Sequence, residues 1–116
     1  MTISVKRVYD AYEKKDGLRV LVDRLWPRGV TKVKAHIDVW AKELSPSTEL
    51  RQWFHEEPER RYESFRTKYA KELKSEKHRA VELLKGEKNV TLVTAAKDIE
   101  HSHVPTLRSF LTSLAK

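Results

Sequence analysis

The chain has 116 residues, of which 39% are hydrophobic and 35% are charged, and this balance predicts a single globular domain with one core. It contains no cysteine, which excludes disulfides, thiol nucleophiles and cysteine-bound metal centres, and fits a reducing compartment. The formal charge of +7 favours an anionic partner. No apolar stretch approaches the length of a membrane span, so we expect a cytoplasmic protein with no membrane partner.

Two strands are predicted near the N-terminus. The first covers residues 3–9, where apolar side chains recur. A Lys-Lys-Asp-Gly turn then leads into a second strand at residues 17–25, and its apolar run from Leu18 to Val22 is typical of a buried strand. The short connection favours an antiparallel hairpin, because a parallel pair would need another strand between its members.

The middle of the chain carries two helix-start signals and one ambiguous segment. Thr31 is suited to cap a short helical turn. Residues 37–42 fit a helix by their i, i+3, i+4 apolar spacing and a strand by their alternation. The segment Ser45 to Glu49 then predicts a helix at residues 47–55, because either serine can accept from free backbone N–H groups and Pro46 suits the first helical position.

The second half of the chain alternates helix, strand and helix. A helix is predicted at residues 58–85, with a stripe of aromatic and leucine side chains and with Gly86 at its end. Its Lys and Arg residues are interleaved with Glu, as on an ordinary solvated helix face. A second buried strand follows at residues 89–96, and an amphipathic helix at residues 104–115.

Polar and charged side chains follow both buried strands. In open α/β sheets, ligands bind beyond the carboxyl ends of the strands, so two parallel strands would bring these side chains to one crevice. The candidate binding residues are Arg24, Trp26, Arg28, Lys97, Ser102 and His103, and the candidate catalytic residues are His101 and Asp98.

An anion at this crevice would use these groups in distinct ways. Arg24 and Arg28 would neutralise its charge, and Lys97 would add to the positive field. His101 would donate a hydrogen bond or a proton, and Asp98 would orient a basic neighbour. The short rigid loop around Arg28 presents that residue outward, which favours a binding role for it.

Several of these residues also have structural explanations. Asp98 can cap the turn that follows it, and Arg24 can form an ion pair with Asp23 or Asp98. Trp26 is more often a packing residue than a stacking platform. The two histidines have no third ligand at metal spacing, so no metal site is predicted. No Gly-rich phosphate loop or other nucleotide motif is present, and no cofactor is predicted.

Three segments together resemble the family called domain of unknown function 488, in its YeaO-like branch. They are residues 20–29 (V-L-V-D-R-L-W-P-R-G), residues 44–54 and residues 90–101. The resemblance extends from about residue 9 to residue 111. It implies an α/β fold with a strand at residues 37–42, and it brings no established reaction.

The resemblance also shows where this chain departs from the wider family. That family commonly has cysteines at the positions of Thr94 and Ser102, a histidine at His103 and an arginine at Val104. Because the thiols and the arginine are missing here, no thiol or cysteine-metal role is implied. The residues that match the YeaO-like pattern are Arg24, Arg28, Lys97, Asp98 and His101.

We therefore predict one α/β domain over residues 1–116, with a small sheet of about four strands, mainly parallel or mixed, flanked by helices. The preferred function is binding of a small anionic ligand, such as a phosphate or carboxylate compound, with or without turnover. One alternative is non-specific nucleic-acid binding through the basic surface, with Trp26 as a stacking group. Another is a structural module whose arginines meet an acidic partner protein, and no oligomeric state is favoured.

Overall fold

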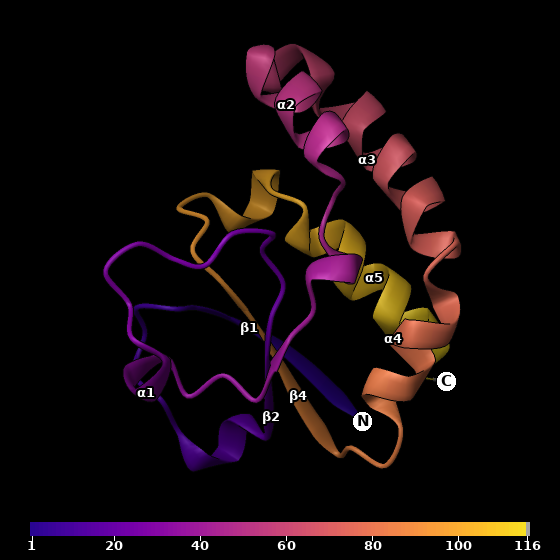
Figure 1. Cartoon of the computed structure of the whole chain (residues 1–116). Coiled ribbons are helices and arrows are strands. Elements are labelled where there is room, and N and C mark those ends of the chain that lie inside the picture. The colour runs from indigo at the N-terminus through magenta and orange to yellow at the C-terminus, as the bar shows by residue number, and fades with distance from the viewer. Residues whose placement is uncertain (116) are drawn as a thin grey trace.

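The last strand in the sequence lies inside the sheet, between the first two. A computed structural model describes residues 1–115. Its four strands are β1 (Thr2–Arg7), β2 (Leu18–Leu21), β3 (Val39–Trp40) and β4 (Asn89–Thr94), and their spatial order is β1-β4-β2-β3. All three pairings are parallel, so the sheet has one carboxyl end (Figure 1). The predicted α/β fold is confirmed, and the ambiguous segment 37–42 contains a strand.

The expected antiparallel hairpin of the first two strands is wrong. β1 and β2 run parallel, each on one side of β4, which is the arrangement that a parallel pair requires. The centre of β4, which is apolar except for Thr91, is consistent with this order, because a strand with a partner on each edge and cover on both faces is buried throughout. The connection returns to the start of β2 through a 3-10 turn at Lys14–Asp16 and through Gly17, whose φ is +69°. A Cβ at Gly17 would overlap the carbonyl oxygen of Asn89.

Four helices cover one face of the sheet, and they are α2 (Thr48–Glu56), α3 (Pro58–Lys74), α4 (Lys77–Leu84) and α5 (Val104–Leu114). The short α1 (Lys32–Ala35) lies on the other side (Figure 1). α5 contacts β4, and α3 packs on α5. α2 and α3 form a helical hairpin that extends beyond the sheet, as Figure 1 shows. Within residues 1–115, no helix combines the length and the apolarity that crossing a membrane requires.

The single helix predicted at residues 58–85 is two helices. Ser75 and Glu76 separate α3 from α4 by a turn, in which both backbone N–H groups return to carbonyls of the last turn of α3. The polar run at this point offers no apolar group to the core, whereas Ala80 and Leu84 beyond it are buried again. A turn lets the chain bring those two residues back to the core.

Helix starts follow the predicted caps with one difference. The Thr31 hydroxyl accepts from the backbone N–H of Lys34, as expected. The Ser47 hydroxyl accepts from the backbone N–H of Leu50 at 3.1 Å, so α2 begins at Thr48. Pro46 therefore precedes the cap and does not occupy the first helical position.

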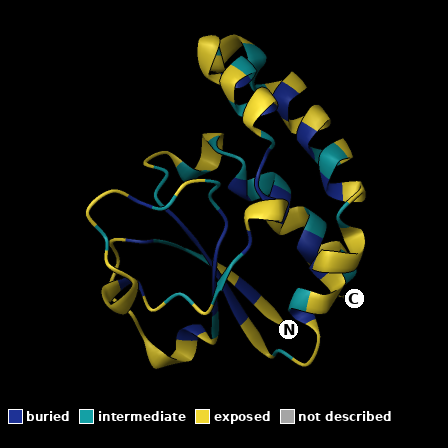
Figure 2. Cartoon of the chain, in the orientation of Figure 1, coloured by how far each residue is buried: buried dark blue, intermediate teal, exposed yellow. Residues whose placement is uncertain are grey.

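The two faces of the sheet are filled in different ways. Under the helices lies the main apolar core, to which the inner side of each helix contributes buried residues while its outer side stays exposed (Figure 2). On the opposite face Val8, Ala35 and Val93 form a small cluster. Beside them Arg19 of β2 is 1% exposed, with Nη1 2.6 Å from the Asp16 carboxylate. It also donates to the carbonyls of Ala35 and His36, so one buried guanidinium ties two segments, the 3-10 turn at Lys14–Asp16 and the end of α1, to the sheet.

Candidate functional site

A cavity of about 440 Å³ opens at the carboxyl ends of β2 and β4. Because these strands are parallel neighbours, the loop after β2 (residues 22–31) and the loop after β4 (residues 95–103) leave the sheet at the same end. α2 forms the third wall, and Phe65 of α3 contributes from the core side. We call this space the strand-end cavity.

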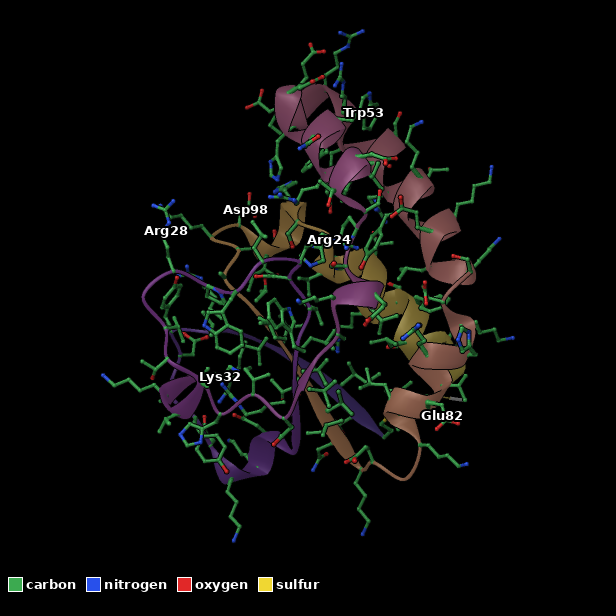
Figure 3. The ribbon with its side chains drawn as sticks, in the orientation of Figure 1. Arg24, Arg28, Lys32, Trp53, Glu82 and Asp98 are labelled. Atoms are coloured by element: carbon green, nitrogen blue, oxygen red, sulfur yellow. The ribbon has the colours of Figure 1, made fainter. Side chains whose placement is uncertain are left out.

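Seven of the eight residues predicted from the sequence line this cavity, and one does not. The seven are Arg24, Trp26, Lys97, Asp98, His101, Ser102 and His103. Arg28 is exposed and lies outside the cavity lining. Figure 3 shows it projecting outward from the loop, away from Arg24. The loop thus separates the two arginines that the sequence placed together, because the turn at Arg28 and Gly29 faces solvent.

Arg24 donates hydrogen bonds to main-chain carbonyls, and within the described residues no carboxylate forms an ion pair with it. Its Nε donates to the Pro46 carbonyl at 2.9 Å, and its Nη2 donates to the Ser45 carbonyl at 3.4 Å. The ion pair expected with Asp23 or Asp98 is not formed among residues 1–115. These bonds hold the guanidinium between the loop after β2 and the start of α2, where it faces the strand-end cavity (Figure 3).

Asp23 joins the two strand ends. Its carboxylate accepts from the Thr94 hydroxyl at 2.7 Å and from the backbone N–H of Ala95 at 2.8 Å. The Thr94 hydroxyl in turn accepts from the backbone N–H of Ala96. Each oxygen of this carboxylate therefore accepts a hydrogen bond from the end of β4, and Asp23 fixes the geometry of the cavity floor.

His103 forms a largely buried part of the cavity wall, with 14% of its side chain exposed. Its Nε2 lies 2.9 Å from the Val22 carbonyl and 3.5 Å from the Asp23 carboxylate, and its ring meets the edge of Tyr69. Burial lowers the pKa of His103, although the nearby Asp23 carboxylate opposes this effect. The neutral ring donates from Nε2 to Val22 and so holds the second loop against β2.

His101 and Asp98 form an exposed pair at the mouth of the cavity. The His101 Nδ1 lies 2.9 Å from the Asp98 carboxylate, and about two thirds of each side chain is exposed. The hydrogen bond from His101 lowers the pKa of Asp98. Asp98 also accepts from the backbone N–H of His101, so it caps the 3-10 turn Ile99–His101, which is the structural explanation weighed for it. Tyr62 steadies this turn by donating to the Glu100 and Ser102 carbonyls.

Sequence reasoning missed Arg51 and His55 of α2, both of which line the cavity. The two residues are four apart, so they share one face of the helix. The Nε of Arg51 is buried and has no hydrogen-bond partner within residues 1–115. The i, i+4 spacing was visible in the sequence, but the side of α2 that meets the strand ends depends on how the helical hairpin packs.

Within residues 1–115, the unpaired charged side chains that line the cavity are cationic. Arg24, Arg51 and Lys97 line it, and within the described residues none of them forms a salt bridge. The hydroxyl of Ser102 donates to the Ile99 carbonyl at 2.6 Å and accepts from the backbone N–H of Val104. Residues 1–115 contain no group of three His, Cys, Asp or Glu side chains placed to hold a metal ion.

Comparison with known proteins gives a family and three groups of relatives. A model of the family described as the inactive DUF488-N3 subclade matches residues 2–116. The chain is 44% identical over 117 residues to the uncharacterized protein YeaO of Escherichia coli, covering 98% of this chain and 100% of that one. Uncharacterized proteins of Mycobacterium bovis and Mycobacterium tuberculosis are 40% identical over 110 residues, which covers 94% of this chain and 92% of theirs. No solved structure gives a significant match.

Proposed function

This chain belongs to the DUF488 family, in its YeaO-like branch, and from that membership and the geometry we propose that it binds a small anionic ligand in the strand-end cavity without turning it over. The matching family model is described as an inactive subclade, which supports binding over catalysis. The rest of the proposal is argued from this chain's own residues.

The observation that carries the proposal is that Arg51 and Arg24 line the same cavity and that, within residues 1–115, neither forms a salt bridge with a carboxylate. A planar guanidinium forms its strongest bonds with carboxylate and phosphate oxygens. An anion bound between Arg51 and Arg24 would neutralise both charges.

The hydroxyl groups near the cavity support binding without turnover. At the positions where the wider family commonly has cysteines, this chain has Thr94 and Ser102. The Thr94 hydroxyl donates to Asp23, and the Ser102 hydroxyl donates to the Ile99 carbonyl. Thr94 is fully buried, so a ligand in the cavity cannot reach its hydroxyl. The Ser102 hydroxyl donates to a main-chain carbonyl, which is too weak a base to activate a nucleophile. The exposed His101 and Asp98 serve the ligand as a hydrogen-bonding rim.

Inorganic phosphate in a thermal-shift assay tests this function. A ligand that binds only the folded state stabilises it by about 2.7 kcal/mol at a hundredfold excess over Kd. We expect phosphate to raise the Tm of the wild type and of the control Arg66→Gln, whose side chain lies on α3 outside the cavity lining. Arg51→Gln should remove the shift.

Two results would contradict the proposal. One is an equal phosphate shift in Arg51→Gln, which would place the anion elsewhere. The other is a shift with short oligonucleotides alone that disappears at high salt, which is the behaviour of non-specific nucleic-acid binding. A shift that survives at high salt and depends on Arg51 supports the cavity.

A further inference from the structure

We infer that the ligand carries its anionic group on an aromatic body, as an aryl phosphate or aryl carboxylate does. This inference rests on the proposed function, which concerns only the anionic group of the ligand, and it describes the uncharged remainder of that ligand. Two features of the strand-end cavity support it, namely its size and the chemistry of the apolar part of its wall.

The cavity is too large for a bare anion. Its volume of about 440 Å³ lies within the range of roughly 300–1,000 Å³ that is usual for sites of complete small-molecule ligands. Such sites are mostly apolar with a few convergent polar groups. An inorganic phosphate held between Arg24 and Arg51 would leave most of this volume to water.

Part of the cavity wall is apolar and largely aromatic. It is formed by Leu25, Trp26 and Pro27 from the loop after β2, and by Phe54 of α2 and Phe65 of α3. Leu25 is 62% exposed, although it lies on the lining of a cavity. Phe54 and Phe65 are only 7% and 2% exposed, so the apolar wall surface that is open to solvent belongs mainly to Leu25 and Trp26. An aromatic body against these two side chains would remove that surface from water and stack on the indole ring.

The aromatic walls are already fixed in place. The indole N–H of Trp26 donates to the Val30 carbonyl, and its ring meets Trp40 edge-on with the centroids 5.4 Å apart. Phe54 and Phe65 stack on each other at 4.3 Å. Because the indole N–H is occupied, Trp26 offers the cavity only its apolar ring surface. Rigid walls of this kind favour a rigid ligand, since little rotamer entropy is lost on binding.

Isothermal titration calorimetry with matched ligand pairs tests the inference. Phenyl phosphate is compared with methyl phosphate, and benzoate with acetate, so that each pair shares its anionic head and differs in its body. We expect the aryl member of at least one pair to bind more tightly, on the order of tenfold or more, because the ring buries apolar surface. Arg51→Gln should abolish binding of that aryl member.

The Leu25→Ser variant tests recognition of the aromatic part of the ligand separately from recognition of its anionic group. Because Leu25 is exposed, the variant should keep the fold, and it should reduce the aryl preference roughly threefold or more through lost apolar contact. Val33→Ser is the matched control, since Val33 is 82% exposed on α1 outside the cavity lining. It should leave all four affinities unchanged.

The outcomes separate the inference from the function on which it rests. Equal affinities within both pairs, with binding still dependent on Arg51, would overturn the aromatic body and leave anion binding in place. An aryl preference that Leu25→Ser does not alter would also contradict the assigned walls. No binding of any of the four anions would overturn both proposals.

Discussion

Replacing Arg19 by methionine should destabilise the protein by about 3–5 kcal/mol, which is the usual cost of breaking a buried ion pair by removing one partner. Arg19 is 1% exposed and donates to the Asp16 carboxylate and to the carbonyls of Ala35 and His36. Methionine fills much of the space but satisfies none of these acceptors, and a buried acceptor without a donor costs about 1–3 kcal/mol. Lys6 remains 2.9 Å from Asp16, so that carboxylate keeps one partner.

Urea unfolding followed by circular dichroism measures this loss as a change in the free energy of unfolding. A small domain has a total stability of about 5–15 kcal/mol, so the variant should unfold at a much lower denaturant concentration. Arg19→Lys keeps the positive charge but loses the planar, forked guanidinium, so its free energy of unfolding should lie between those of the wild type and Arg19→Met. Arg66→Met, whose side chain is half exposed and pairs with an exposed Glu63, should change stability by no more than about 0.5 kcal/mol. A loss below about 1 kcal/mol in Arg19→Met would refute the view that this guanidinium holds the loops to the sheet.

Two further predictions follow from the backbone and from the buried histidine. Gly17→Ala should lower the free energy of unfolding by about 1–3 kcal/mol, because φ is +69° and the new Cβ would overlap the Asn89 carbonyl. Gly86→Ala is the control for the positive φ alone, since a Cβ at Gly86 would meet no atom. The folded-state pKa of His103 lies below its unfolded value near 6.5, since burial disfavours the charged ring. Its contribution to stability is therefore complete above about pH 6.5 and is lost as the pH falls toward the folded pKa, where the unfolded chain alone takes the proton. His103→Gln should flatten the pH dependence of Tm in that window, and an unchanged slope would mean that another group causes it.

Local patterns predicted most of the elements, because each depends on neighbours in the sequence. The apolar runs identified β2 and β4, and the hydroxyls of Thr31 and Ser47 marked helix starts that the structure confirms. Strand order could not be read in this way. Whether β1 pairs with β2 or with β4 depends on contacts between residues nearly a whole chain apart, and a short connection is compatible with either arrangement.

For the candidate site, as for the fold, the sequence indicated the features that depend on neighbouring residues and not those that depend on tertiary packing. Strand ends are local features, so the residues after β2 and β4 could be named, and the parallel sheet brings them to one cavity. Arg28 differed from expectation because a single turn decides on which side of a loop a residue emerges. Arg51 was missed because its place depends on how α2 packs, and its helical spacing looks like that of any solvated arginine.

The central position of β4 has a consequence for the synthesis of the protein. Thr2 pairs with Asn89, so the first strand to leave the ribosome waits for a partner 87 residues later in the chain. Until residues 89–94 have emerged, β1 and β2 have no strand between them, and the only pairing open to either is that of β2 with the two-residue β3. Contacts of such long range are formed slowly. We therefore expect nascent chains stalled before residue 89 to contain helices but no stable sheet, and the protein to reach its fold only when synthesis is nearly complete.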